Sequence, residues 1–143
     1  MLVDLPTSEA EEVSPQQAWQ MLKEQRGVKL VDVRTAPEWL YVGLPDIGAT
    51  AGTLLQISWH IFPDMRENVA FADDLKRAAA PDDVLLFLCR SGGRSLTAVR
   101  AAKEAGFKQA YSIRGGFEGP VDDHGHRGSV EGWKCAHLAW RQQ

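Results

Sequence analysis

The sequence predicts an α/β domain with a central, mainly parallel sheet and helices on both faces. Short apolar runs that suit strands alternate along the chain with segments of helical periodicity, as in consecutive βαβ units. The run at residues 84–88 is apolar throughout, which is typical of a strand buried on both faces. The chain has 143 residues, 44% hydrophobic and 24% charged, so we expect residues 1–143 to form one domain.

The chain is expected to begin with a helix and a strand. Ser14-Pro15 is typical of an N-cap followed by proline at the first helical position, and this helix should end before Gly27. The apolar, β-branched segment 29–34 then predicts a buried strand, with Asp32 and Arg34 at its carboxyl end.

Glycine and proline break up the next part of the chain. We expect a chain reversal at residues 35–37, and residues 41–53 leave room for a loop and one short strand. From residue 67 to residue 80 the apolar positions recur at helical spacing until Pro81, which predicts a second helix.

The strand at 84–88 opens the second half of the chain. It is followed by a glycine-bearing loop at 89–95, by a helix over residues 96–105 and by a last strand over residues 109–113. A C-terminal helix is expected to carry Trp133, Cys135, Leu138 and Trp140.

The charge and the cysteine content argue against several classes of protein. A net charge of -3 lacks the overall positive field of a nucleic-acid-binding protein. No apolar stretch is long enough to span a membrane, and residues 1–12, expected to be a flexible segment, have no signal-peptide pattern. With two cysteines, Cys89 and Cys135, a disulfide framework is not expected, although one bridge stays open. A reducing, cytoplasmic compartment fits best.

Cys89 lies where an active-site thiol is expected. It ends a buried parallel strand, at the sheet edge where open α/β folds bind ligands. The small residues that follow let backbone amides converge on one anion at the start of the next helix. Together with the two arginines of the loop, they favour the thiolate and can lower a cysteine pKa from ~8.5 to roughly 3.5–7.5. We therefore expect an anion-binding loop made of Arg90, Ser91, Gly92, Gly93, Arg94 and Ser95.

Each candidate also has an ordinary structural explanation. Cys89 could be a small hydrophobe in a core strand, but such a residue does not require two glycines and two arginines in the next five positions. Either Arg90 or Arg94 could be a solvated charge, although a cation at a helix N-terminus is unfavourable without a bound anion. Asp32 and Arg34 fit a local ion pair that braces loops beside the site better than a direct role.

Three motifs occur together in the chain: Leu30-Val31-Asp32-Val33-Arg34 followed by Pro37-Glu38-Trp39, the loop from Leu88 to Ser95, and Ile113-Arg114-Gly115-Gly116. In this combination the sequence resembles the rhodanese superfamily from about residue 13 to residue 116. The resemblance implies a five-stranded sheet and a sulfurtransferase that carries sulfane sulfur on Cys89 as a persulfide. It implies that Arg90 and Arg94 engage a small anionic donor such as thiosulfate, without a metal or organic cofactor. The acceptor would be cyanide, a thiol or a partner protein.

The length of the loop separates two chemistries on this fold. The related phosphatases and arsenate reductases have five residues between cysteine and arginine, whereas Arg94 follows Cys89 after four. A sulfur atom fits the smaller ring, so phosphatase or arsenate reductase activity is the weaker enzyme hypothesis. A non-catalytic module that senses sulfur or binds a protein through Cys89 is the alternative from another class.

Two segments depart from the family pattern. Residues 43–49 lack the histidine that many members have there, and residues 117–132 form a polar stretch expected to be an inserted loop beside the Cys89 pocket. No metal site is predicted, because a ligand spacing is absent among Asp122, Asp123, His124 and His126. Cys135 is expected to be an ordinary free thiol, with sulfur acceptor or resolving thiol as the alternative.

Overall fold

The computed structural model describes residues 11–142 and contains a five-stranded sheet. Its strands lie in the order β1 (Glu12–Val13), β8 (Gln109–Ile113), β7 (Val84–Leu88), β2 (Val28–Asp32) and β4 (Thr53–Gln56). Every neighbouring pair is parallel, so all five strands end at the same edge of the sheet. The predicted α/β class with a mainly parallel five-stranded sheet is confirmed.

β7 lies at the centre of the sheet because its five side chains are all apolar and all buried. The predicted bounds of this strand and of β8 agree with the structure. The predicted flexible segment, residues 1–12, falls outside the described residues except for Glu11 and Glu12, and Glu12 belongs to β1.

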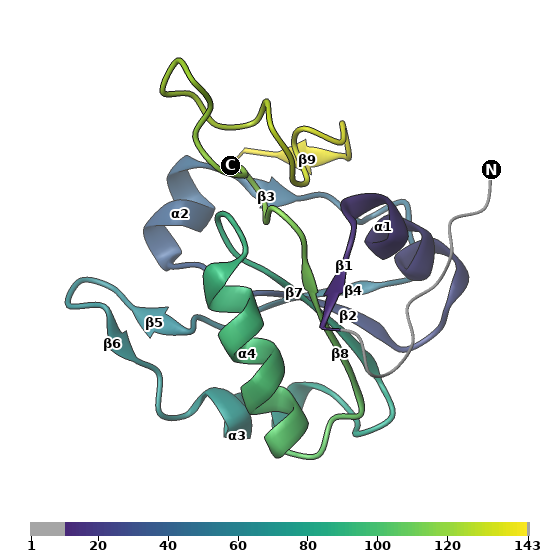
Figure 1. The fold of residues 1–143 in the computed structure, drawn as a ribbon. Coiled ribbons are helices and arrows are strands. Elements are labelled where there is room, and N and C mark those ends of the chain that lie inside the picture. The colour runs from purple at the N-terminus through teal and green to yellow at the C-terminus, as the bar shows by residue number, and fades with distance from the viewer. Residues whose placement is uncertain (1–10, 143) are drawn as a thin grey trace.

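Helices cover both faces of the sheet, as the sequence predicts (Figure 1). α1 (Pro15–Glu24) packs on one face and joins a hydrophobic cluster with side chains of β2, β7 and β8. α3 (Phe71–Ala78) and α4 (Gly93–Glu104) pack on the other face in a second cluster. The predicted start of α1 is correct, because the Ser14 hydroxyl accepts a hydrogen bond from the Gln17 N–H at 3.0 Å.

Two elements in the first half of the chain differ from the sequence prediction. Residues 35–37, predicted as a chain reversal, begin a short helix, α2 (Ala36–Tyr41). The predicted helix over residues 67–80 begins only at Phe71, because residues before it form a hairpin of β5 (His60–Ile61) and β6 (Arg66–Glu67). Pairing with β5 thus replaces the first helical turn.

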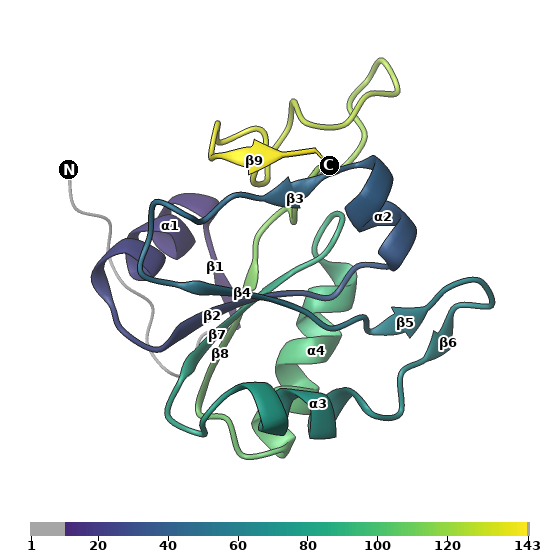
Figure 2. The ribbon, with the colours of Figure 1, turned by 180° about the vertical axis from the view of Figure 1, so that it is seen from behind.

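The C-terminal helix predicted around Cys135 is wrong. Residues 129–139 form turns and bends, and β9 (Trp140–Arg141) pairs antiparallel with β3 (Leu44–Pro45). Figure 2 shows this pair above the edge of the main sheet where its strands end. Trp133 is fully buried and its indole N–H donates to the carbonyl of Ala139 at 2.8 Å. Packing of single aromatic residues, and not helical periodicity, fixes this segment.

The polar stretch at residues 117–132 contains neither helix nor strand. Its tip is closed by a hydrogen bond from the Asp122 N–H to the carbonyl of His126 at 2.7 Å. Within residues 11–142, no helix is long and apolar enough to cross a lipid bilayer.

Candidate active site

Cys89 follows the last residue of β7, at the edge where the parallel strands end. The residue is 1% exposed, and its Sγ accepts a hydrogen bond from the backbone N–H of Gly92 at 3.1 Å. α4 begins at Gly93, so the unpaired amides of its first turn lie next to this loop. Gly92 has a φ of 120°, a backbone conformation that residues with a Cβ rarely adopt. This conformation lets the loop turn tightly beside the sulfur of Cys89.

A second segment, residues 116–119, is bonded to the backbone of the Cys89 loop. The Phe117 N–H donates to the carbonyl of Cys89 at 2.7 Å, and the N–H groups of Glu118 and Gly119 both donate to that of Arg90 at 3.0 Å. Gly116 has a φ of 61°, and a Cβ at this position would lie 2.7 Å from the carbonyl carbon and oxygen of Arg90. Close approach of the two backbones therefore requires glycine here.

Replacing Gly116 with alanine is expected to destabilise the protein more than the same change at Gly125. Both glycines have positive φ, so each substitution costs about 1–2 kcal/mol of backbone strain. A Cβ at position 125 would meet nothing within 4 Å, whereas at position 116 overpacking adds about 1–3 kcal/mol. Urea unfolding of both variants measures the difference. Equal losses in the two would show that the contact with Arg90 does not hold the loop.

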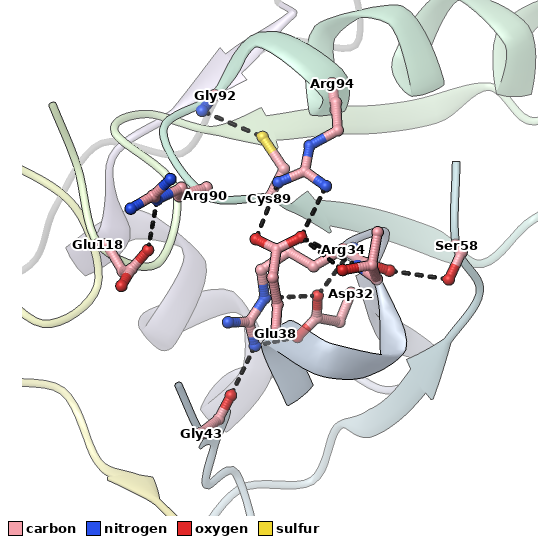
Figure 3. Close-up of polar contacts among 11 residues, drawn as sticks. Asp32, Arg34, Glu38, Gly43, Ser58, Cys89, Arg90, Gly92, Arg94 and Glu118 are labelled. Atoms are coloured by element: carbon pink, nitrogen blue, oxygen red, sulfur yellow. Dashed lines mark hydrogen bonds and ion pairs between the residues drawn. The ribbon is translucent and has the colours of Figure 1, made fainter. Parts of the chain in front are cut away.

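Arg94 forms a bidentate ion pair with a carboxylate from another part of the chain (Figure 3). Its Nη1 and Nη2 donate to Oε1 and Oε2 of Glu38 at 2.9 and 3.0 Å. Glu38 lies on α2, and its Oε1 also accepts hydrogen bonds from the backbone N–H and the hydroxyl of Thr35. The pair therefore joins the start of α2 to the start of α4 beside Cys89.

Arg90 pairs with a carboxylate as well. Its Nε donates to Oε2 of Glu118 at 2.8 Å, and in Figure 3 this pair lies on the side of Cys89 away from Arg94. The Arg90 side chain is 50% exposed, but that of Glu118 is 15% exposed. The carboxylate is thus the more deeply placed partner.

Asp32 and Arg34 form the buried ion pair that the sequence favours. Nε and Nη2 of Arg34 donate to the two carboxylate oxygens of Asp32 at 2.9 and 2.7 Å, and both side chains are fully buried. Arg34 Nη2 also donates to the carbonyl of Gly43 at 2.8 Å, and its guanidinium lies 4.3 Å from the ring centre of Phe117. The pair connects the end of β2 to two loops beside the site.

The part of the sequence that forms this site matches a known family. The family model of the rhodanese-like domain aligns with residues 14–122. The chain belongs to the rhodanese family. The matched part includes Cys89, its loop and Glu118, and it ends at Asp122 in the polar stretch.

Several known proteins are similar to this chain in sequence or in fold. The crystal structure of Rv0390 from M. tuberculosis is 41% identical, with a TM-score of 0.85, over 94% of this chain and 98% of that one. An uncharacterized Rickettsia rickettsii protein, the RP600 homolog, is 35% identical over 125 residues, 87% of this chain and 91% of its own length. The polysulfide-sulfur transferase homodimer of Wolinella succinogenes is 24% identical, with a TM-score of 0.58, over 75% of this chain and 69% of that one. At that identity, the last match is evidence of a shared fold alone.

In the structure the six predicted loop residues follow Cys89 and extend into the first turn of α4. Arg90, Ser91 and Gly92 connect β7 to α4, and Gly93, Arg94 and Ser95 form the first turn of that helix. Ser95 is fully buried, and its hydroxyl has no hydrogen-bond partner within residues 11–142, whereas Ser91 is exposed. Which of these groups binds an anion stays a prediction.

The sequence reasoning missed two carboxylates of the site. Glu38 belongs to the motif Pro37-Glu38-Trp39, which by itself assigns it no role, whereas the pattern Thr35-x-x-Glu38 with Pro37 is typical of a helix start. Glu118 carries no local signal, because its partner Arg90 lies 28 residues earlier in the chain. Its place follows from the hydrogen bonds that bring residues 117–119 onto the loop.

Glu38 and Arg94 shift each other's pKa, each toward the charged form. Burial alone would raise the pKa of Glu38, but hydrogen bonds from Arg94 and Thr35 and the charge of Arg94 hold it below its usual value. Burial likewise acts to lower the pKa of Arg94, and Glu38, with smaller effects of Cys89 and Asp32, raises it instead. Both groups are therefore charged near neutral pH.

The Glu38–Arg94 pair is expected to make the protein more sensitive to acid. Because the pKa of Glu38 is lower in the folded state, the stability gained at neutral pH is lost as pH falls below the usual glutamate range. Urea unfolding of the wild type between about pH 5 and pH 3 should therefore show a steeper decline than Glu38→Gln. The exposed Glu104→Gln serves as control, with the slope of the wild type. Parallel declines in wild type and Glu38→Gln would contradict the effect.

Cys135 and the histidines of the polar stretch lie outside the Cys89 loop. No group of three potential metal ligands occurs in the part of the chain that the structure describes. Asp122 accepts hydrogen bonds from the N–H groups of His124 and His126 and from the Ser129 hydroxyl, so it orders its own loop. Cys89 and Cys135 are both free thiols.

Proposed function

We propose that this rhodanese-like domain is a sulfurtransferase in which Cys89 accepts sulfane sulfur from thiosulfate or a persulfide. The observation that carries the proposal is the Cys89 Sγ inside a loop of four residues before Arg94, with the Gly92 N–H 3.1 Å away. Backbone amides in such a turn stabilise an anionic sulfur. The loop is shorter than the one that a tetrahedral phosphate needs.

Two displacement steps make up the proposed reaction. The Cys89 thiolate attacks the outer sulfur of the donor, the donor S–S bond breaks, and sulfite or a thiolate leaves with the electron pair. The resulting persulfide then gives its outer sulfur to cyanide, a thiol or a partner protein, and the Cys89 thiolate returns. Neither step changes the total electron count, so the cycle requires no metal or organic cofactor.

The place of the reaction in the cell is part of the proposal. Two free thiols fit a reducing, cytoplasmic setting. Measuring the redox state of Cys89 and Cys135 in rapidly alkylated cell extracts tests this setting. A predominant disulfide between them would contradict it.

Intact-protein mass spectrometry tests the proposed activity. Incubation with thiosulfate or a low-molecular-weight persulfide should add one sulfur atom, and cyanide or a thiol should remove it. Failure of Cys89 to gain sulfur from thiosulfate, mercaptopyruvate and a persulfide alike would overturn the proposal.

The same preparation distinguishes the two rival functions. Turnover of an aryl phosphate would favour a phosphatase, which the loop length disfavours. A persulfide that forms on Cys89 but never passes to cyanide, a thiol or a protein would favour a sulfur sensor. Catalytic turnover of donor and acceptor together supports the sulfurtransferase.

A further inference from the structure

Each of the two arginines in the Cys89 loop forms an ion pair with its own carboxylate. Glu38 holds Arg94 through two hydrogen bonds, and Glu118 holds Arg90 through one. A loop that is strongly basic in sequence therefore carries little net charge in the folded protein. An incoming dianion is attracted less than it would be by two unpaired guanidinium groups.

Glu118 is a fixed part of the site and not a mobile surface charge. Its backbone N–H donates to the carbonyl of Arg90 at 3.0 Å, and its own carbonyl accepts from the Gly128 N–H at 2.7 Å. With the side chain 15% exposed, the carboxylate is shielded from solvent ions more than an exposed side chain would be. Burial lowers the pKa of Lys134, the charge of Glu118 opposes this lowering and the charge of Arg34 adds to it, so Lys134 lies close to the Glu118 carboxylate. These contacts therefore hold the Glu118 carboxylate beside Arg90.

The burial of Cys89 determines which part of a donor meets this charge. Because the residue is 1% exposed, a donor reaches Sγ with its terminal sulfur, and the rest of the donor stays beside the exposed residues of the loop. Arg90, whose side chain is 50% exposed, and its partner Glu118 lie on one side of Cys89 (Figure 3). Thiosulfate brings two negative charges there, whereas an alkyl persulfide carries at most one.

We propose that Glu118 is a specificity-determining residue that disfavours dianionic sulfur donors and thereby selects alkyl persulfides over thiosulfate. The inference rests on the proposed function and concerns the same site. The bond changes are the same for both donors: the donor S–S bond breaks, an Sγ–S bond forms, and sulfite or an alkyl thiolate leaves. The proton of a protonated persulfide stays on the transferred sulfur and exchanges with solvent. Donor charge is therefore the property that Glu118 can distinguish.

The test compares thiosulfate with 2-hydroxyethyl persulfide as donors for the wild type and Glu118→Gln. Glutamine retains an oxygen that can accept from Arg90 Nε, so the substitution removes the charge and keeps the hydrogen bond. At low salt, kcat/KM for thiosulfate should rise about threefold to tenfold, and that for the persulfide by less. Glu104→Gln, an equal charge change at the far end of α4, should leave the ratio of the two values unchanged.

The dependence of kcat/KM on salt concentration provides a second measurement on the same two proteins. In the wild type, kcat/KM for thiosulfate should depend weakly on ionic strength, and the dependence should steepen in Glu118→Gln. If the ratio of kcat/KM for thiosulfate to kcat/KM for the persulfide is unchanged or lower in Glu118→Gln, the inference is overturned. The proposed function still stands in that case, provided that Cys89 gains sulfur. Absence of sulfur loading from both donors in the wild type refutes the proposed function and the inference with it.

Discussion

Cys89→Ser is expected to load no sulfur and to transfer none to cyanide. A serine hydroxyl is far less acidic and less nucleophilic toward sulfur than a thiol, and it forms no stable persulfide. Loss of the nucleophile in an enzyme with a covalent intermediate commonly lowers the rate by roughly 10³-fold or more. Intact mass after incubation with a persulfide and thiocyanate formation in the presence of cyanide measure the two steps.

Cys135→Ser is the matched control for this experiment. Cys135 is partly exposed and lies in the turns after the polar loop, whereas Cys89 is buried at the end of β7. The control variant is expected to load and transfer sulfur as the wild type does. If Cys135→Ser loads sulfur but fails to pass it on, Cys135 is the acceptor. If Cys89→Ser still gains sulfur, the assigned nucleophile is wrong.

The part of this site that local sequence determines could be predicted. The apolar run of β7, the thiol after it and the glycines at the start of α4 lie close together in the sequence, and each position has a local physical requirement. A strand buried on both faces needs apolar residues, and a turn with positive φ at Gly92 needs glycine. The structure therefore has these residues where the sequence predicts them, in the central strand and in the turn that follows it.

The charge of the site could not be predicted, because it depends on distant contacts. Arg94 and Glu38 are 56 residues apart, and Arg90 and Glu118 are 28 apart. A sequence shows which residues are charged but not which of them are brought together by folding. The same limitation explains the wrong C-terminal helix, where burial of Trp133 and pairing of β9 with β3 outweigh local helix propensity.

The motif Asp-x-Arg shows how burial determines the contribution of an ion pair to the free energy of unfolding. It occurs at Asp32 and Arg34 and again at Asp64 and Arg66. Both pairs form ion pairs, but the first is fully buried and the second has side chains 59–63% exposed. The two pairs are therefore identical in sequence spacing and opposite in environment.

Asp32→Asn is accordingly expected to lower the free energy of unfolding by about 3–5 kcal/mol. The substitution preserves shape but leaves the Arg34 guanidinium buried without a countercharge, next to the carbonyl of Gly43 and the ring of Phe117. Asp64→Asn, the same change in the exposed motif, should cost about 0–1 kcal/mol. Urea unfolding at neutral pH compares the two, and equal losses would contradict the assignment of Asp32 and Arg34 as a buried structural pair.

A double variant separates the loss of the ion pair from the cost of an isolated charge. In Asp32→Asn with Arg34→Met, the uncompensated guanidinium is gone and an apolar side chain of similar length lies against Phe117. Burying an unpaired charge costs more than losing a neutralised pair. We therefore expect the double variant to be more stable than Asp32→Asn alone. If it is less stable, the contacts of Arg34 with Gly43 and Phe117 contribute more than the charge balance, and the pair fixes the loops mainly through the guanidinium.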